Sequence, residues 1–72
     1  MNVEQIRKRL REDPKPFVIR LSDGRRFRIP HEDYIAIGKH LVSVIDYDGY
    51  AVNIDPLHIV SVDDARAKGV QR

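Results

Sequence analysis

The feature that most constrains this chain is a hydrophobic period of two residues that is interrupted twice by an Asp-Gly turn. From Phe17 to Leu21 an apolar side chain stands at every second position, the pattern of a strand with one buried face. Asp23-Gly24 and Asp48-Gly49 each lie between two segments of this kind. Glycine supplies the positive φ that a tight hairpin turn needs, so the pattern predicts antiparallel strands joined by short turns.

The apolar segments predict a mainly β fold with five short strands. We expect them at residues 17–21, 26–29, 41–47, 50–55 and 59–62, with one turn of 3₁₀ helix at Pro56-Leu57-His58 between the last two. Five strands this short curl into a small antiparallel barrel rather than lie flat, which places the barrel at about residues 16–63. Residues 31–40 permit two interpretations, one helical turn or a bent continuation of the second strand.

The start of the chain predicts one amphipathic helix at about residues 2–12. Asn2 is a suitable N-cap, and three apolar residues then fall on a single helical stripe: Val3, Ile6 and Leu10. Pro14 disfavours helical geometry at the preceding residue, so the helix is expected to end there.

Length and composition bound the organisation. Seventy-two residues suffice for a single domain, which we place at residues 1–63 with a polar C-terminal tail at 64–72. The chain has no cysteine for a disulfide or thiolate metal site, so self-association is the remaining way to stabilise so small a core. No apolar run approaches the ~18 residues of a membrane span, and the N-terminus lacks the apolar core of a signal peptide. We expect a soluble, cytoplasmic protein without a membrane partner.

Metal binding and catalysis are not expected, and neither is a cofactor. His31-Glu32-Asp33 groups possible ligands, but neighbouring residues in a turn point apart, and a zincin motif would need histidine at Ile35. No serine stands on a nucleophile elbow, and no glycine-rich phosphate loop is present. The pattern therefore favours a binding module over an enzyme.

Three arginines are the main candidate binding residues. Arg20, Arg26 and Arg28 are predicted to lie together on the outer face of the first hairpin. Like charges on neighbouring strands destabilise a sheet unless negative charge opposes them. RNA, DNA or an acidic protein surface could provide that charge. Three carboxylates of the chain itself could do so as well: Asp23, Glu32 and Asp33.

A second basic cluster lies on the predicted helix. Arg7, Lys8 and Arg11 could form a secondary basic rim for the same polyanion. Cations near a helix C-terminus also stabilise the helix through its dipole, and we favour this simpler interpretation.

The layout and two motifs resemble the bacterial Sm-like RNA chaperone family (Hfq) and the wider Sm fold. The motifs are the Pro16–Phe27 segment with its Asp-Gly turn, and His58-Ile59-Val60-Ser61-Val62 at the far end. The chain also resembles small bacterial proteins of unassigned function that share a core of Asp-Gly-Arg, Phe, Pro-His and a following aromatic residue. The first resemblance implies an Sm/SH3-like barrel behind an N-terminal helix, closed into a ring of six or seven subunits, with a hexamer as first choice.

The same resemblance implies single-stranded RNA as the ligand. The family's Lys-His pair near the ring pore corresponds to Leu57-His58, so His58 alone carries over as a uridine contact. The family's base-stacking aromatic falls at Arg20, and Arg26 stands where the family has a basic residue. The alternative is a module that binds another protein and no nucleic acid.

Overall fold

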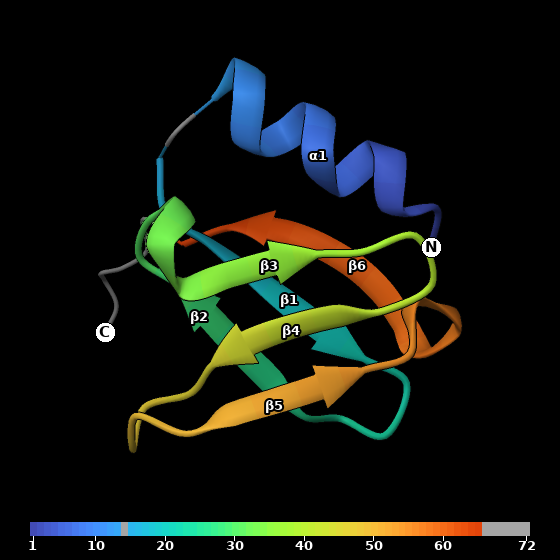
Figure 1. The fold of residues 1–72 in the computed structure, drawn as a ribbon, viewed down its shortest axis with the longest axis vertical. Helices are drawn as coiled ribbons and strands as arrows, with labels where there is room; N and C mark the ends of the chain where they lie inside the picture. The colour runs from blue at the N-terminus through green and yellow to red at the C-terminus, as the bar shows by residue number, and fades with distance from the viewer. Residues whose placement is uncertain (14, 66–72) are drawn as a thin grey trace.

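The computed structural model describes residues 1–13 and 15–65, and within them the chain is mainly β with one helix at its start (Figure 1). The described elements, in chain order, are α1 (Val3–Glu12), β1 (Phe17–Leu21), β2 (Arg26–Ile29), the 3₁₀ turn η1 (Glu32–Tyr34), β3 (Ile35–Ile37), β4 (Val42–Ile45), β5 (Ala51–Ile54), the 3₁₀ turn η2 (Pro56–His58) and β6 (Ile59–Asp64).

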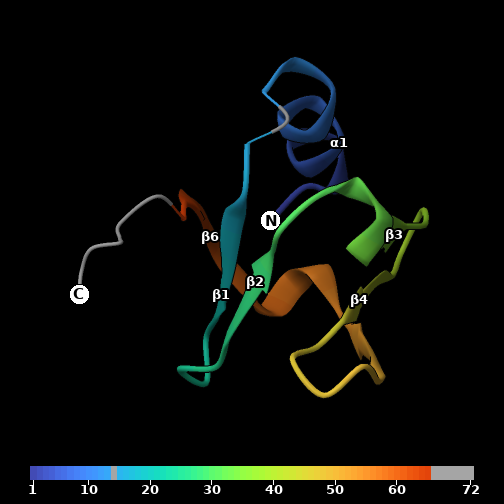
Figure 2. The same ribbon diagram turned by 90° about the vertical axis from the view of Figure 1, so that its left-hand side faces the viewer.

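The described strands form two three-stranded antiparallel sheets, ordered β2-β1-β6 and β3-β4-β5. Figures 1 and 2 show the second sheet lying across the first, with α1 over one end of both. In the first sheet Ile19 pairs with Phe27 on one side and Val62 on the other. A bulge between Arg20 and Leu21 shifts the register toward β6. Because β1 pairs on both edges, it is the centre of this sheet.

The hydrophobic core joins both sheets to the helix. Among the described residues the core cluster contains nine buried hydrophobic side chains: Ile6, Phe17, Ile19, Leu21, Ile29, Val42, Val44, Ile54 and Ile59. The alternation in β1 that the sequence predicted is confirmed, since its odd-numbered residues are buried while Arg20 is exposed. The helical stripe is confirmed as well, because Ile6 is fully buried and Val3 and Leu10 pack against the core. Asn2 caps the helix by accepting the Glu4 N–H at 2.8 Å.

The strand number differs from the predicted five, because the described residues contain six. The additional strand, β3, lies in the segment that the sequence left open, where one 3₁₀ turn and one short strand follow each other. Pro30 has no N–H for the ladder, so β2 ends at Ile29. His31 Nδ1 then accepts the Asp33 N–H at 3.3 Å and caps η1.

The predicted closed barrel is corrected to two separate sheets within residues 1–13 and 15–65. The chain crosses between the sheets twice, each time at a proline with a single 3₁₀ turn: Pro30 precedes η1, and Pro56 begins η2. These tight connections redirect the chain into the other sheet instead of pairing the flanking strands. In the part described, β5 and β6 therefore have one hydrogen-bonded neighbour each.

The boundaries of the last strands also differ from the sequence prediction. β4 and β5 are shorter at both ends than 41–47 and 50–55, while β6 runs to Asp64. The Ala65 N–H donates to Pro16 O at 3.2 Å. Backbone hydrogen bonds to the first sheet therefore extend to Ala65, two residues beyond the predicted domain end at residue 63. The rest of the predicted tail, residues 66–72, lies outside the described residues. Within the described ranges, no helix has the length and apolar character needed to cross a membrane.

Replacement of Ile6 by alanine tests how far the fold depends on the helix. Ile6 is fully buried between α1 and the sheets, and truncation of such a side chain costs about 2–5 kcal/mol. We expect Ile6→Ala to lower the free energy of unfolding in urea by this amount, a large part of what so small a core supplies. Leu57→Ala, at a residue that is 84% exposed, is the control and should change it by less than about 0.5 kcal/mol. Equal effects would contradict this packing.

Candidate nucleic-acid interface

Arg20, Arg26 and Arg28 share the outer face of the β2-β1-β6 sheet, as the sequence predicted. Arg20 of β1 lies directly opposite Arg26 of β2. Arg28 lies opposite Val18, which is two residues before Arg20 in β1. All three arginines are exposed. The closest like-charge pairing is thus Arg20 with Arg26. We call these three residues the arginine face.

In the part of the chain that the structure describes, one carboxylate forms an ion pair with the arginine face, and it comes from β6. Arg20 Nη1 lies 3.9 Å from Asp63 Oδ2, which also accepts the Ser61 hydroxyl at 3.0 Å. The three carboxylates considered from the sequence, Asp23, Glu32 and Asp33, make no ion pair with these arginines among the described residues, and Asp23 pairs with Arg25 instead. Within residues 1–13 and 15–65, Arg26 and Arg28 make no side-chain hydrogen bond or ion pair. The face therefore carries uncompensated positive charge.

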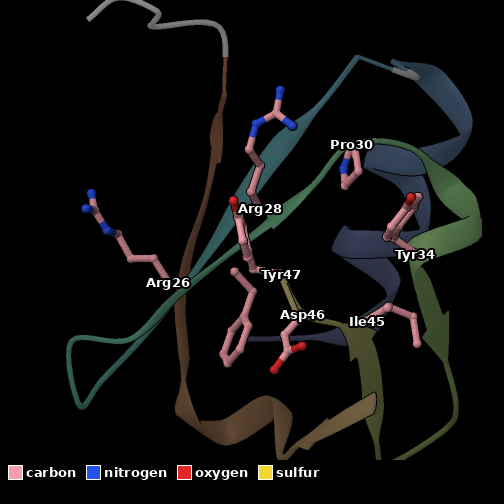
Figure 3. A pocket seen from close by; sticks show the side chains of 8 residues that line it. Arg26, Arg28, Pro30, Tyr34, Ile45, Asp46 and Tyr47 are labelled. Atoms are coloured by element: carbon pink, nitrogen blue, oxygen red, sulfur yellow. The ribbon is translucent and has the colours of Figure 1, made fainter. Parts of the chain in front are cut away.

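A groove adjoins the arginine face where β2 meets the end of β4 (Figure 3). It encloses about 500 Å³ and brings together residues from four parts of the fold: Arg26, Phe27, Arg28, Pro30, Tyr34, Ile45, Asp46 and Tyr47. Figure 3 shows Arg26 and Arg28 leaving β2 at the rim, with Arg26 extending away from the other labelled side chains. The groove thus has apolar and aromatic walls next to two cationic groups.

The β4–β5 turn fixes one wall of the groove. Asp46 Oδ1 accepts the N–H groups of Asp48 at 3.0 Å and Tyr50 at 3.1 Å, and Gly49 supplies the positive φ (88°). These bonds hold the turn in one conformation while Tyr47, at 102% relative exposure, lies fully open to solvent. Tyr47 and Tyr34 line the same groove although they are distant in the sequence, so the packing of separate segments brings them together.

The β1–β2 turn is fixed in a similar way. Asp23 Oδ1 accepts the Arg25 N–H at 3.0 Å, and Asp23 Oδ2 accepts from Arg25 Nε at 2.8 Å. The backbone N–H of Arg25 lowers the pKa of the Asp23 carboxyl below its ordinary value, and the Arg25 guanidinium adds to this. Because that pKa is lowered, the bonded turn is favoured above the ordinary aspartate pKa and weakens as the pH falls through the lowered one.

The three basic residues of the predicted secondary rim differ in burial and in their contacts. Arg7 is half-buried and donates to Ile37 O at 3.1 Å and to Gly38 O at 3.4 Å, so it ties α1 to the end of β3. Lys8 and Arg11 are exposed. The predicted secondary rim therefore has two exposed members and one that holds the fold.

Arg9, which the sequence did not single out, connects α1 to the first sheet. Its guanidinium lies 5.0 Å from the centre of the Phe17 ring, and its Nη2 lies 3.2 Å from Asp64 Oδ1. Nη1 donates to the Asp13 carbonyl. This side chain is only 17% exposed, so Arg9 stabilises the packing of the helix against the sheet.

His58 lies apart from the arginine face, in η2. Its side chain is exposed, and its carbonyl accepts the Ser22 N–H at 2.8 Å, which fixes η2 against the first hairpin turn. The Lys39-His40 pair, one hairpin earlier in the chain, shares a hollow of about 480 Å³ with Leu57. Among the residues described, no group of three or more His, Asp or Glu is placed to hold a metal ion.

Comparisons with protein-family models, with curated proteins and with solved structures found no match to this chain. The functional argument therefore depends on the residues and their geometry.

Replacement of Arg9 separates the structural arginine from its exposed neighbour. Arg9→Gln removes the contact with Phe17 and the pair with Asp64, and we expect a loss of about 1–2 kcal/mol in the free energy of unfolding. Arg11→Gln, at an exposed position of the same helix, should change it by less than about 0.5 kcal/mol. Urea unfolding followed by circular dichroism measures both. A smaller loss for Arg9→Gln than for Arg11→Gln would contradict the assignment.

Proposed function

We propose that this protein is a cytoplasmic, ring-forming small β module of the Sm/SH3-like kind that binds single-stranded RNA through the arginine face, and that it is not an enzyme. The observation that carries the proposal is the pairing of Arg20 with Arg26 beside Arg28 on one exposed face. A sheet that places like charges opposite each other is destabilised unless negative charge offsets the repulsion, and a polyanion would supply it. Asp63 lies near one of these arginines only.

Phosphate is a suitable counter-charge for this face. Arginine binds phosphate through a planar fork of donors, and its guanidinium also stacks on bases. The side chains of Arg26 and Arg28 have no competing partner in the part of the chain that the structure describes. The tyrosines of the adjoining groove add stacking surfaces, which single-stranded nucleic acid uses without strong sequence preference. RNA is therefore favoured over duplex DNA, whose bases are already stacked.

Self-association into a ring would repeat the arginine face once in each subunit. β5 and β6 each have a free edge within the described residues, and free edges attract further strands. Pairing of the β5 edge of one subunit with the β6 edge of the next closes a ring, for which a hexamer is our first choice. A ring repeats Arg20, Arg26 and Arg28 around one surface, so a formal charge of +2 per chain becomes a dense basic patch. His58 would act separately, as the uridine contact that the Sm-like resemblance implies.

A protein-binding module without nucleic acid is the second candidate. Leu57 in η2 and Val60 in β6 are large apolar residues that are 84% and 55% exposed, and Val60 lies on a free strand edge. Such an edge can also accept a strand from another protein. The two candidates differ in whether the arginine face is needed for binding.

The RNA proposal is tested by changing Arg20, Arg26 and Arg28 together to glutamine. In the parent, affinity for a single-stranded RNA oligonucleotide should fall steeply with salt, with a slope in log–log form of about −0.7 per phosphate contact. The triple variant should bind more weakly and show a shallower slope. Fluorescence anisotropy over a salt series measures both quantities. Lys8→Gln combined with Arg11→Gln is the matched control on the helix, and a smaller loss is expected there.

The outcome that contradicts the RNA proposal is equal affinity in the triple variant and the parent, or no affinity in either at low salt. The protein-binding alternative would then take its place.

Assembly is tested by the mass in solution. Light scattering at micromolar concentration should give a closed oligomer, six chains by our first choice. Val60→Lys places a charge on the free β6 edge and should lower the mass, since edge lysines oppose strand pairing. Ala36→Lys, at an exposed position of the edge strand β3 that the proposed ring does not use, is the control that should retain the parent mass. A parent mass equal to the single chain of 8.4 kDa contradicts ring formation.

A further inference from the structure

The groove beside the arginine face contains groups that can recognise a base as well as groups that bind phosphate. Phe27, Pro30 and Ile45 provide apolar surface, and Tyr34 and Tyr47 provide aromatic rings. A volume of about 500 Å³ is within the usual range for small-molecule pockets, so a nucleobase fits within it. Arg26 and Arg28 lie at its rim, next to where the phosphates of such a nucleotide would run (Figure 3).

Tyr47 is the stacking surface that the structure offers most openly. It is fully exposed, although an aromatic ring of this size is usually at least partly covered. The two N–H bonds to Asp46 Oδ1 hold the turn on which it stands, so ordering the turn adds no cost when a base stacks. Tyr50 follows in the same turn and is also exposed, but it does not line the groove.

Asp46 gives the groove a chemical preference. Its Oδ1 holds the turn, while its Oδ2 has no hydrogen-bond partner in residues 1–13 and 15–65. An ionised carboxylate only accepts hydrogen bonds, so it selects a base edge that donates. The Watson–Crick edge of guanine presents an imino N–H beside an amino group, two adjacent donors. Uracil presents one imino N–H between two carbonyl oxygens, which the carboxylate repels.

We propose that this groove holds one guanine of a single-stranded RNA. The guanine ring lies against Tyr47, its donor edge faces Asp46, and Arg26 and Arg28 bind the adjoining phosphates. The positive rim also offsets the repulsion between Asp46 and the phosphates. This inference rests on the proposed function, because the same arginines provide the phosphate contacts.

The base preference is tested with heptameric RNA oligonucleotides of uridine in which the central base is uracil, adenine, cytosine or guanine. The parent should bind the guanine oligonucleotide about tenfold more tightly than the all-uridine one, as expected for hydrogen bonds to a charged acceptor. Asp46→Asn keeps Oδ1 for the turn but replaces the free oxygen with an NH₂ donor. It should abolish the guanine preference, because the guanine oligonucleotide loses its charged acceptor while the repulsion of uracil is removed. Asp48→Asn removes the same charge from the same turn outside the groove and should retain the preference.

Stacking is tested by Tyr47→Leu with Tyr50→Leu as its control. Stacking of a base on an aromatic ring contributes to the binding free energy. Loss of the Tyr47 ring should therefore weaken binding of the guanine oligonucleotide about tenfold. Tyr50→Leu should weaken it less than about twofold. Both positions are exposed, so neither change removes a buried contact, and equal solution mass and circular dichroism confirm that the fold is intact.

Failure of the guanine site and failure of the proposed RNA-binding function would give different results. Parent protein that binds all four oligonucleotides equally, or an Asp46→Asn variant that keeps the guanine preference, overturns the guanine site and leaves the arginine face in place. Parent protein that binds none of them at low salt overturns both proposals.

Discussion

The rest of the structure depends on β1, the strand that pairs with β2 on one edge and β6 on the other. Its inner face supplies Phe17, Ile19 and Leu21 to the core, where the second sheet and Ile6 of the helix meet them. Arg9 attaches the helix to the same strand through the Phe17 ring. The pairing of β1 with β6 closes a loop that contains most of the chain, and closing a long loop costs conformational entropy. The fold therefore forms only when non-local contacts offset this entropy cost.

The two faces of β1 have separate roles. Because side chains alternate along a strand, the residues that build the core fix where Arg20 points, and the register with β2 fixes Arg26 opposite it. The position of the arginine face is therefore fixed by the core and the strand register rather than by contacts among the three arginines, which repel one another. The groove depends on the same arrangement, since Phe27 and Arg28 come from β2 while Asp46 and Tyr47 come from the end of β4. Binding groups on a rigid scaffold lose little freedom when a ligand binds.

The sequence predicted most of the local structure because local rules determine it. Alternation around β1, glycine in both hairpin turns, the Asn2 cap and the prolines each act over a few residues. It left β3 open, since a three-residue strand directly after a 3₁₀ turn carries too short a pattern to distinguish from a bent β2. A barrel was expected from the number and shortness of the strands and from the Sm-like resemblance, whereas the two proline turns divide the described strands into separate sheets.

The arginine face was predictable and its surroundings were not. Alternation places Arg20, Arg26 and Arg28 on one side of a hairpin, but the approach of Asp63 depends on how β6 pairs with β1. Arg7 and Arg9 looked like the other cations of the helix, and only the packing shows that they contact β3 and Phe17. The groove joins β2, η1 and the end of β4, so no single stretch of sequence contains it.

The central claim is that RNA binds across the outer face of β1 and β2, and mapping the contact residue by residue tests it most directly. Backbone amide resonances of the labelled protein would be followed by transverse-relaxation-optimised NMR as a uridine-rich RNA with one central guanine is added. The account predicts that the largest shifts lie at Arg20, at Arg26–Arg28 and in the Asp46–Tyr50 turn, with small shifts at Lys8 and Arg11. Shifts confined to the β5 and β6 edges, or no shifts at low salt, would contradict it.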